Sequence, residues 1–263
     1  MRNRRRCIQR HFRLIFAQPA LLVCLLLIID ANAAETADPD TVPSGLNADR
    51  PSFAESPGTV PPGHVQLEAG VKYVEIDSNN EKLTVGQFNF RIGWREALEF
   101  RVLWDGYEDR DPGESDFADP KVQVKWRFTP DRSIGFRAAL LGSLSVPLGD
   151  SDAVEPQANF IWSYGRPSGP QPYGTFDVRY PEENGQRRFV VEPSLGAEFP
   201  RGKLAFFVAY FGIFKEGSNP VHSVVGGMTY LLNPRLQLDV EFGLGINNDA
   251  DVFAVSTGFV QRW

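Results

Sequence analysis

The fold of this chain is decided by its last residues, Phe253-Ala254-Val255-Ser256-Thr257-Gly258-Phe259-Val260-Gln261-Arg262-Trp263. Large residues alternate with small ones, which is the period-2 pattern of a β-strand with two different faces. The strand ends on an aromatic residue, and aromatic residues of transmembrane β-barrels lie at the membrane interface. We therefore expect a closing barrel strand whose insertion signal consists of Phe253, Val255, Phe259 and Trp263.

The N-terminal residues predict export. Arginines precede an apolar run that is densest from Leu21 to Ile29, and Ala31-Asn32-Ala33 supplies the small residues of a cleavage site. This order is typical of a secretory signal peptide, which we place at residues 1–33. Both cysteines lie within it, so we expect the mature chain to have no thiol for a disulfide or a metal site.

The charge of the mature chain argues against a nucleic-acid partner. Cleavage would remove six of the 27 Lys and Arg residues and one of the 33 acidic residues, which changes the net charge from −6 to −11. Nucleic-acid binding requires a basic face. No later segment approaches the roughly 18 apolar residues of a helical span. The exported chain therefore either stays soluble or enters a membrane as β-structure.

Residues 34–63 are polar, rich in proline and without a regular period. Proline cannot donate to a β-ladder, and this stretch contains Pro51, Pro57, Pro61 and Pro62. We expect either a periplasmic arm or a plug, meaning a segment tucked into the mouth of a barrel.

Residues 64–263 alternate between apolar and polar side chains almost without interruption, which predicts an all-β, antiparallel transmembrane β-barrel with a polar lumen. The link near Gly165–Tyr173 is long and the following strand is short, so ten or fourteen strands are alternatives to twelve. The twelve predicted strands are 65–76, 82–94, 97–107, 121–129, 133–146, 154–164, 174–180, 188–199, 204–215, 222–232, 236–247 and 252–263.

A soluble β-sandwich also alternates, so three further features favour the membrane. Aromatic residues such as Trp94, Trp126 and Tyr230 lie near strand ends, as an interfacial girdle requires. Strands of eleven to thirteen residues suit a tilted bilayer crossing better than the usual globular strand of about five or six. The even-numbered connections tend to be short, whereas odd-numbered ones such as 105–120 are often long and acidic.

Alternation also assigns charged residues to the lumen. The third to fifth strands (Glu99 aside) are basic, whereas the eighth and eleventh are acidic, so we expect opposed walls with a transverse field. Arg91, Arg101, Lys125 and Arg127 would then favour anions. Filling of the lumen by ion pairs is the alternative. The candidate pore-lining residues are Glu68, Lys72, Arg91, Glu99, Arg101, Lys121, Lys125, Arg127, Arg137, Glu155, Asp177, Arg179, Glu192, Asp239 and Glu241.

The sequence offers little for catalysis. The mature chain retains two histidines, His64 and His222. Ser223 is adjacent to His222, so on a strand the two side chains would face opposite sides. A serine hydrolase needs its nucleophile within hydrogen-bond reach of the base. We therefore expect no enzyme, no catalytic residue, no cofactor and no metal site.

Two opening motifs carry a resemblance to a known family: Asp49-Arg50-Pro51-Ser52-Phe53 and Thr59-Val60-Pro61-Pro62-Gly63, followed by Gln66 to Gly70. Later matches are Glu192 to Gly196 and Gly245 to Asp251. Over residues 48–263 the chain resembles the outer-membrane transporter family labelled "putative meta-pathway of phenol degradation". The resemblance implies an outer-membrane β-barrel that passes small molecules, with a link to aromatic degradation inherited from the label. The chain departs from it by ending in Trp263 rather than Phe and by carrying Gln261.

Together these features predict a Gram-negative outer-membrane barrel for passive, porin-like passage of a small solute, hydrophobic or aromatic in one reading. The expected partners are the solute, outer-membrane lipids and the barrel-assembly machinery. A filled structural or adhesive barrel and a lipid-modifying enzyme are the alternatives. The sequence names neither the solute nor the oligomeric state.

Overall fold

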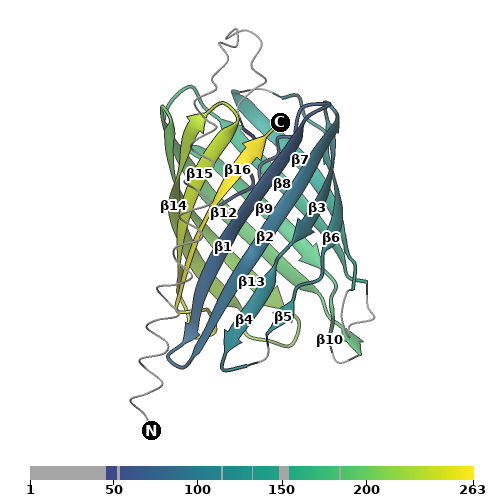
Figure 1. Cartoon of the computed structure of the whole chain (residues 1–263), viewed down its shortest axis with the longest axis vertical. Coiled ribbons are helices and arrows are strands. Elements are labelled where there is room, and N and C mark those ends of the chain that lie inside the picture. The colour runs from purple at the N-terminus through teal and green to yellow at the C-terminus, as the bar shows by residue number, and fades with distance from the viewer. Residues whose placement is uncertain (1–45, 52–53, 114, 132, 148–153, 184) are drawn as a thin grey trace. The chain divides into compact units, whose positions relative to one another are not determined.

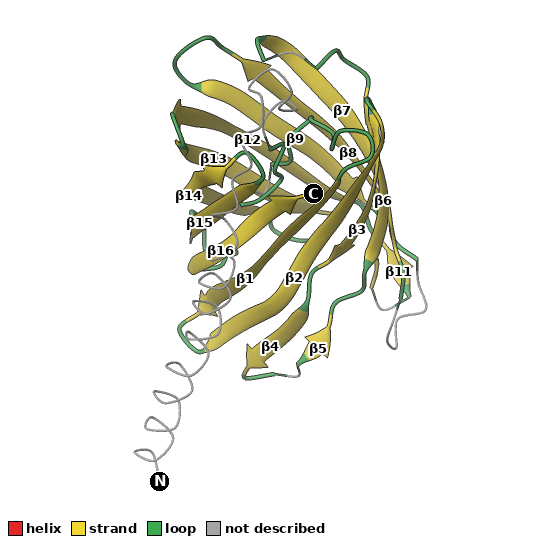
Figure 2. Cartoon of the chain, turned by 45° about the horizontal axis from the view of Figure 1, so that its top comes forward, coloured by secondary structure: helices red, strands yellow, loops and turns green. Residues whose placement is uncertain are grey.

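The computed structural model describes residues 46–51, 54–113, 115–131, 133–147, 154–183 and 185–263. Its regular structure in those ranges consists of antiparallel strands (Figures 1 and 2). The predicted signal peptide, and residues 34–45 of the predicted arm, lie outside the described residues. Among the described residues, no helix has the length and apolar character to cross a membrane.

Twelve strands form a closed antiparallel barrel, as the alternation predicts. Strand β1 pairs with β2 on one side and with β16 on the other, and Gln66 lies opposite Arg262 in the second pair. The barrel strands are β1 (Val65–Asp77), β2 (Asn80–Arg95), β3 (Leu98–Trp104), β6 (Lys121–Arg127), β7 (Gly135–Ser145), β8 (Pro156–Gly165), β9 (Gln171–Arg179), β12 (Val190–Arg201), β13 (Leu204–Lys215), β14 (Val221–Asn233), β15 (Leu236–Gly245) and β16 (Phe253–Arg262).

The predicted strand 97–107 is wrong after Trp104. Strand β3 ends at Trp104, and β4 (Tyr107–Asp111) continues along β2 and pairs with β5 (Asp116–Phe117). Gly106 causes the break. Its φ is +91°, and an added Cβ would lie 2.3 Å from the carbonyl oxygen of Val85, so only glycine fits this turn.

The link after β8 is shorter than predicted. Strand β9 begins at Gln171 and includes Pro172, which lies opposite Ala197, so the connection is only 166–170. The observed count excludes the ten-strand and fourteen-strand alternatives. A further small hairpin, β10 (Glu182–Glu183) with β11 (Gln186–Arg187), lies in the connection after β9.

The connections differ between the two ends of the barrel. The end that carries the C-terminus, at the top in Figure 1, has the short links 96–97, 202–203 and 234–235. We call it the turn end. The opposite end carries the link 105–120 and is called the loop end. One loop-end link, 78–79 between β1 and β2, is also short.

The distribution of polar and apolar residues is the opposite of that in a soluble protein, with apolar side chains outside and charged side chains inside. Large apolar side chains such as Trp94, Trp126 and Leu244 are exposed on the outer face, whereas Arg91 and Lys125 are fully buried. Two small apolar clusters lie among the described buried residues, one around Leu141 and one around Phe207. Figure 2 shows the ring of strands that encloses this polar lumen. The fold therefore presents an apolar belt outside and charged groups inside.

Candidate functional site

The described residues that precede β1 lie against the inner wall of the barrel. We call residues 46–51 and 54–62 the lumen segment. Asp49, Ala54, Thr59 and Val60 of this segment are buried, and its residues contact β1, β2, β3, β6 and β15 through the hydrogen bonds and ion pairs described below. The lumen segment and the barrel wall together form the candidate site.

Glycines in the wall make room for the lumen segment. A Cβ added at Gly93 of β2 would lie 2.1 Å from the carbonyl oxygen of Pro61. One added at Gly70 of β1 would lie 2.5 Å from Cζ of Arg50, and one at Gly258 of β16 would lie 2.6 Å from its Nε. At Gly93 the close atoms are backbone, so glycine is what allows the segment to lie against β2. At Gly70 and Gly258 the close segment atoms are the end of the flexible Arg50 side chain, which would have to move.

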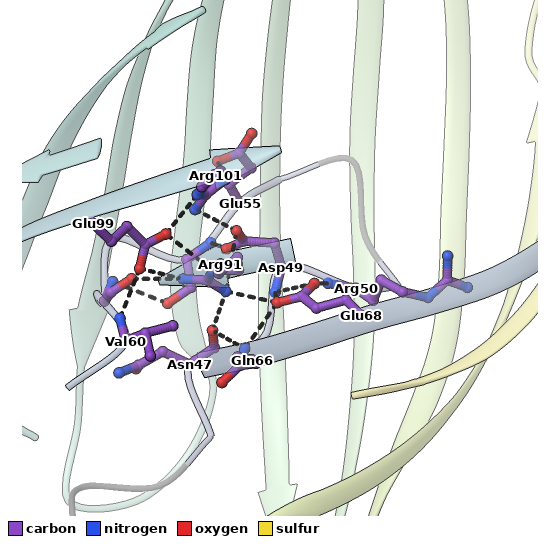
Figure 3. Close-up of polar contacts among 12 residues, drawn as sticks. Asn47, Asp49, Arg50, Glu55, Val60, Gln66, Glu68, Arg91, Glu99 and Arg101 are labelled. Atoms are coloured by element: carbon purple, nitrogen blue, oxygen red, sulfur yellow. Dashed lines mark hydrogen bonds and ion pairs between the residues drawn. The ribbon is translucent and has the colours of Figure 1, made fainter. Parts of the chain in front are cut away.

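Arg91 of β2 is the centre of the site (Figure 3). Its Nε and Nη2 donate to the two carboxylate oxygens of Glu99 at 2.9 and 3.0 Å, and Nη1 donates to Glu68 at 2.6 Å. The same guanidinium donates to the carbonyl oxygens of Asn47 at 2.5 Å and Gly58 at 3.2 Å. Arg91 therefore joins two strands and two parts of the lumen segment.

The two wall carboxylates also bind the segment backbone. Glu68 accepts hydrogen bonds from the backbone N–H groups of Asp49 at 3.1 Å and Arg50 at 3.0 Å. Glu99 accepts one from the backbone N–H of Val60 at 2.7 Å. Each wall carboxylate thus satisfies a buried backbone donor and pairs with Arg91, which is what a buried charge requires to be tolerated.

Two further wall cations pair with acidic residues of the segment. Arg101 of β3 contacts Asp49 at 2.5 Å and Glu55 at 2.8 Å, and its Nε donates to Glu99 at 2.5 Å. The ammonium of Lys125 on β6 contacts Asp49 at 3.3 Å and Glu55 at 3.7 Å, and donates to the carbonyl oxygen of Ser56 at 2.6 Å. We call these charged groups the lumen ion cluster: Asp49, Glu55, Glu68, Arg91, Glu99, Arg101 and Lys125.

Electrostatics keep Asp49 ionised. Burial alone would raise the pKa of its carboxyl group, but the charges of Arg101, Arg91 and Lys125 outweigh burial and lower that pKa below its ordinary value of 3.8. Asp49 also accepts a hydrogen bond from the backbone N–H of Ser56 at 2.8 Å, which closes a local loop in the segment. The carboxylate is therefore a permanent negative charge at neutral pH.

The lumen segment reaches the opposite wall through Arg50. Its guanidinium donates to the carboxylate of Asp239 on β15, with Nη2 at 3.2 Å from Oδ1. Asp49 meets the basic wall while its neighbour Arg50 meets the acidic wall. The order of these two charges along the segment matches the field that the opposed walls would create.

The segment divides two cavities. A cavity of about 270 Å³ includes Arg137, Tyr173, Glu198 and Phe207 in its lining. A second, of about 280 Å³, includes Lys72, Gln87, Asp105 and Glu241. The residues that line both cavities are Asp49, Arg50, Pro51 and Glu55. The first cavity, called the turn-side cavity, includes Gln171 and Ala205 from the turn end, and the second is called the loop-side cavity.

The predicted pore-lining residues differ in burial. Those that are buried are Glu68, Arg91, Glu99, Arg101, Lys125, Arg127, Asp177, Asp239 and Glu241. Those of intermediate exposure are Lys72, Lys121, Arg137, Glu155, Arg179 and Glu192. The structure brings five of them into the lumen ion cluster: Glu68, Arg91, Glu99, Arg101 and Lys125.

Several of the others have partners outside the lumen ion cluster. Arg127 donates to the carbonyl oxygens of Glu96 and Thr129, and Arg137 lies 3.6 Å from Asp131. Lys121 pairs with Asp105 at 3.1 Å, Arg179 with Glu192, and Asp177 accepts from Gln157. Glu155 lies just before β8 rather than within a strand. The roles of all these residues in permeation remain predictions.

Sequence reasoning missed the residues that the segment itself contributes. Asp49, Arg50 and Glu55 were grouped with an arm or plug and given no individual role. The charges of these three residues are a weak signal in the sequence. Each is opposite in sign to the wall that it contacts, but this can be recognised only when the strand order is known. Tyr173, Glu198 and Phe207, which line the turn-side cavity, were also missed.

Three of the insertion-signal residues lie on the closing strand β16, and Trp263 directly follows it. Ala69 of β1 lies opposite Phe259, and Val65 and Trp263 exchange backbone hydrogen bonds of 3.2 and 2.9 Å. Trp263 is exposed. The function of Phe253, Val255, Phe259 and Trp263 in membrane insertion remains a prediction.

The retained histidines lie apart from the lumen ion cluster. His64 is 3.2 Å from the carbonyl oxygen of Pro62, and Nδ1 of His222 is 2.8 Å from the hydroxyl of Tyr210. Ser223 is buried while His222 is only partly so. In the described part of the chain, no three His, Cys, Asp or Glu side chains are grouped to hold a metal ion.

The barrel is similar in fold to solved structures of outer-membrane proteins. An outer membrane channel from Pseudomonas putida F1 is similar with a TM-score of 0.60 and 10% identity, over 78% of this chain and 97% of that chain. The NanC porin is similar with a TM-score of 0.53 and 10% identity, over 75% of this chain and 98% of the porin. At this identity the likeness concerns the fold. No curated protein matches the sequence.

The family profile described as "Putative MetA-pathway of phenol degradation" matches residues 48–263, which includes most of the lumen segment and the whole barrel. The chain belongs to this family, as the opening motifs predict.

Proposed function

We propose that the protein is an outer-membrane channel for the passive passage of a small solute. The observation that carries this proposal is the pair of lumen cavities, of about 270 and 280 Å³, separated by the stretch that includes Asp49, Arg50 and Glu55. A polar, partly hollow interior inside an apolar outer wall suits a conduit better than a solid structural barrel. Similarity to an outer membrane channel and to a porin supports the same role.

The outer membrane is the proposed location. An apolar outer face with exposed Trp94, Trp126 and Tyr230 fits a bilayer and its interfaces. This proposal includes an N-terminal signal peptide and release of the mature chain by cleavage after residue 33. It also includes contact with outer-membrane lipids and folding by the barrel-assembly machinery. The conduit needs no covalent chemistry, so we propose no enzymatic activity.

The charged walls have a different proposed role from the one that alternation alone suggested. Arg91, Arg101 and Lys125 are paired with carboxylates of the wall and of the lumen segment. Their charge is therefore largely compensated and does not act on a passing anion in this state. We propose that the basic wall first holds the segment, and that the segment sets the width of the conduit between the two cavities.

Liposome swelling tests this function. Proteoliposomes with the wild-type protein should swell in a small neutral sugar faster than protein-free liposomes. Arg50→Gln removes the ion pair with Asp239 and should increase the rate severalfold, because the segment loses its contact with the acidic wall. Arg166→Gln is the matched control, since Arg166 is exposed in a turn-end link. Swelling at the background rate for the wild type and Arg50→Gln alike would identify a filled barrel.

A further inference from the structure

Glu55 differs from the other carboxylates of the lumen ion cluster. Its side chain is 20% exposed, whereas those of Asp49, Glu68 and Glu99 are 7%, 1% and 0% exposed. Each of those three accepts a hydrogen bond from a backbone N–H of the segment. Within the described residues, the Glu55 carboxylate contacts two cationic side chains, Arg101 at 2.8 Å and Lys125 at 3.7 Å. Glu55 is therefore the carboxylate of the cluster that an external anion would replace most easily.

The position of Glu55 makes that exchange accessible. Glu55 and Arg101 both line the loop-side cavity, and Glu55 also lines the turn-side cavity. Pro51, Phe88 and Leu103 add apolar surface to the loop-side cavity. At about 280 Å³ it can hold a small molecule whose polar head meets Arg101. A solute in that cavity would lie beside the Glu55–Arg101 ion pair.

Charge balance allows one exchangeable anion. The lumen ion cluster has three cations, Arg91, Arg101 and Lys125, against four carboxylates. The three buried carboxylates alone balance these cations, so Glu55 is the additional one. If Glu55 moves into the aqueous cavity and another carboxylate takes its place on Arg101, the charge within the cluster is unchanged.

We propose that Arg101 and Lys125 form a binding site for a small organic carboxylate, and that Glu55 occupies this site as an internal competitor. A guanidinium presents its N–H donors in a planar fork that matches a carboxylate, and Lys125 adds a second positive charge. The inference deepens the proposed channel function and rests on it for the route by which the ligand arrives.

Exchange would also loosen the boundary between the cavities. Glu55 is one of the residues that separate them, and its contacts with Arg101 and Lys125 attach this part of the segment to β3 and β6. The contacts of Glu68 and Glu99 with the backbone at Asp49 and Val60 would remain. The bound solute would thus release only the middle of the segment.

The test measures binding of fluoroacetate to the full mature protein in detergent micelles by ¹⁹F line broadening, with fluoroacetamide as the neutral probe. Glu55→Gln removes the competitor and should increase the affinity for fluoroacetate about tenfold, since a tethered competitor lowers the fraction of binding-competent sites. Glu216→Gln, at an exposed position near the loop end, is the matched control and should bind like the wild type. Fluoroacetamide should not broaden in any variant.

Lys125→Gln in the Glu55→Gln background should reduce the gained affinity, with circular dichroism to verify that each variant is folded. Equal affinities for fluoroacetate in the wild type and in folded Glu55→Gln would overturn the proposal, as would equal broadening of the neutral probe. Because binding is measured without flux, binding by a protein that shows no swelling would refute the channel and leave the site intact. Swelling without carboxylate binding would support the channel and refute the carboxylate site.

Discussion

Arg91 illustrates how a buried charge is made tolerable in this barrel. Moving an ion out of water costs several kcal/mol, and only well-placed partners repay it. Arg91 meets this condition with a two-point contact to Glu99, a contact to Glu68 and two backbone carbonyl partners. The geometry requires a planar fork of donors, because the partners lie on different sides of the guanidinium.

Arg91→Lys should therefore reduce the free energy of unfolding by about 3 kcal/mol, within the range for breaking a buried ion pair. A lysine ammonium keeps the charge but cannot make the two-point contact with Glu99 while also reaching Glu68. Urea unfolding in lipid vesicles gives the value. Arg166→Lys, an exposed position in a turn-end link, should change it by less than about 0.5 kcal/mol. Equal small losses in both variants would show that the network does not depend on the guanidinium.

At the scale of elements, the strands were predictable, whereas the path and contacts of the lumen segment were not. Alternation located strands such as β13 and β15 closely, because a two-faced strand needs one residue type on each side. The break at Gly106 was missed, since the backbone clash that requires glycine there involves Val85 of another strand. Pro172 was excluded from β9 although it lies within the strand.

The lumen segment has no period, so its path depends on contacts with distant residues. Sequence reasoning assigned Glu68, Arg91 and Glu99 to the lumen by alternation, and they are buried there. It could not foresee that these residues would bind backbone N–H and C=O groups of Asn47, Asp49 and Val60, because nothing local specifies such partners. Long-range pairing of this kind appears only in three dimensions.

Gly93→Ala tests whether glycine allows the segment to lie against β2. The new Cβ would lie 2.1 and 2.4 Å from the carbonyl oxygens of Pro61 and Val60, which are backbone atoms that cannot rotate away. We expect the segment to shift, and cleavage after Glu55 by a glutamate-specific protease to become about tenfold faster, because cleavage requires local opening. Gly142→Ala, where nothing lies within 4 Å of the added Cβ, should leave the rate unchanged. Unchanged cleavage in folded Gly93→Ala would contradict this account.

At the scale of the whole molecule, the two faces of the barrel wall require opposite environments, apolar outside and polar inside. The outer wall exposes side chains such as Phe100 and Phe242, which water would disfavour and lipid accepts. The inner wall buries Arg101, Lys125 and Asp239, which lipid would reject. Residues that are neighbours along a strand therefore face different solvents, and the same substitution should have different costs at adjacent positions.

Met228 and Thr229 of β14 provide the sharpest comparison, because they are adjacent near the middle of one strand. Met228 is exposed on the outer face, whereas Thr229 lines the turn-side cavity together with Glu198. Met228→Lys should lower the free energy of unfolding in lipid vesicles by about 2–4 kcal/mol, the cost of a lysine near the bilayer midplane. Thr229→Lys should cost less than about 1 kcal/mol, since its ammonium faces a polar cavity with a nearby carboxylate. Both values come from urea unfolding of vesicle-inserted protein. Similar losses at the two positions would mean that the outer face of β14 does not contact lipid, and the barrel would then have to bury that face against another protein surface.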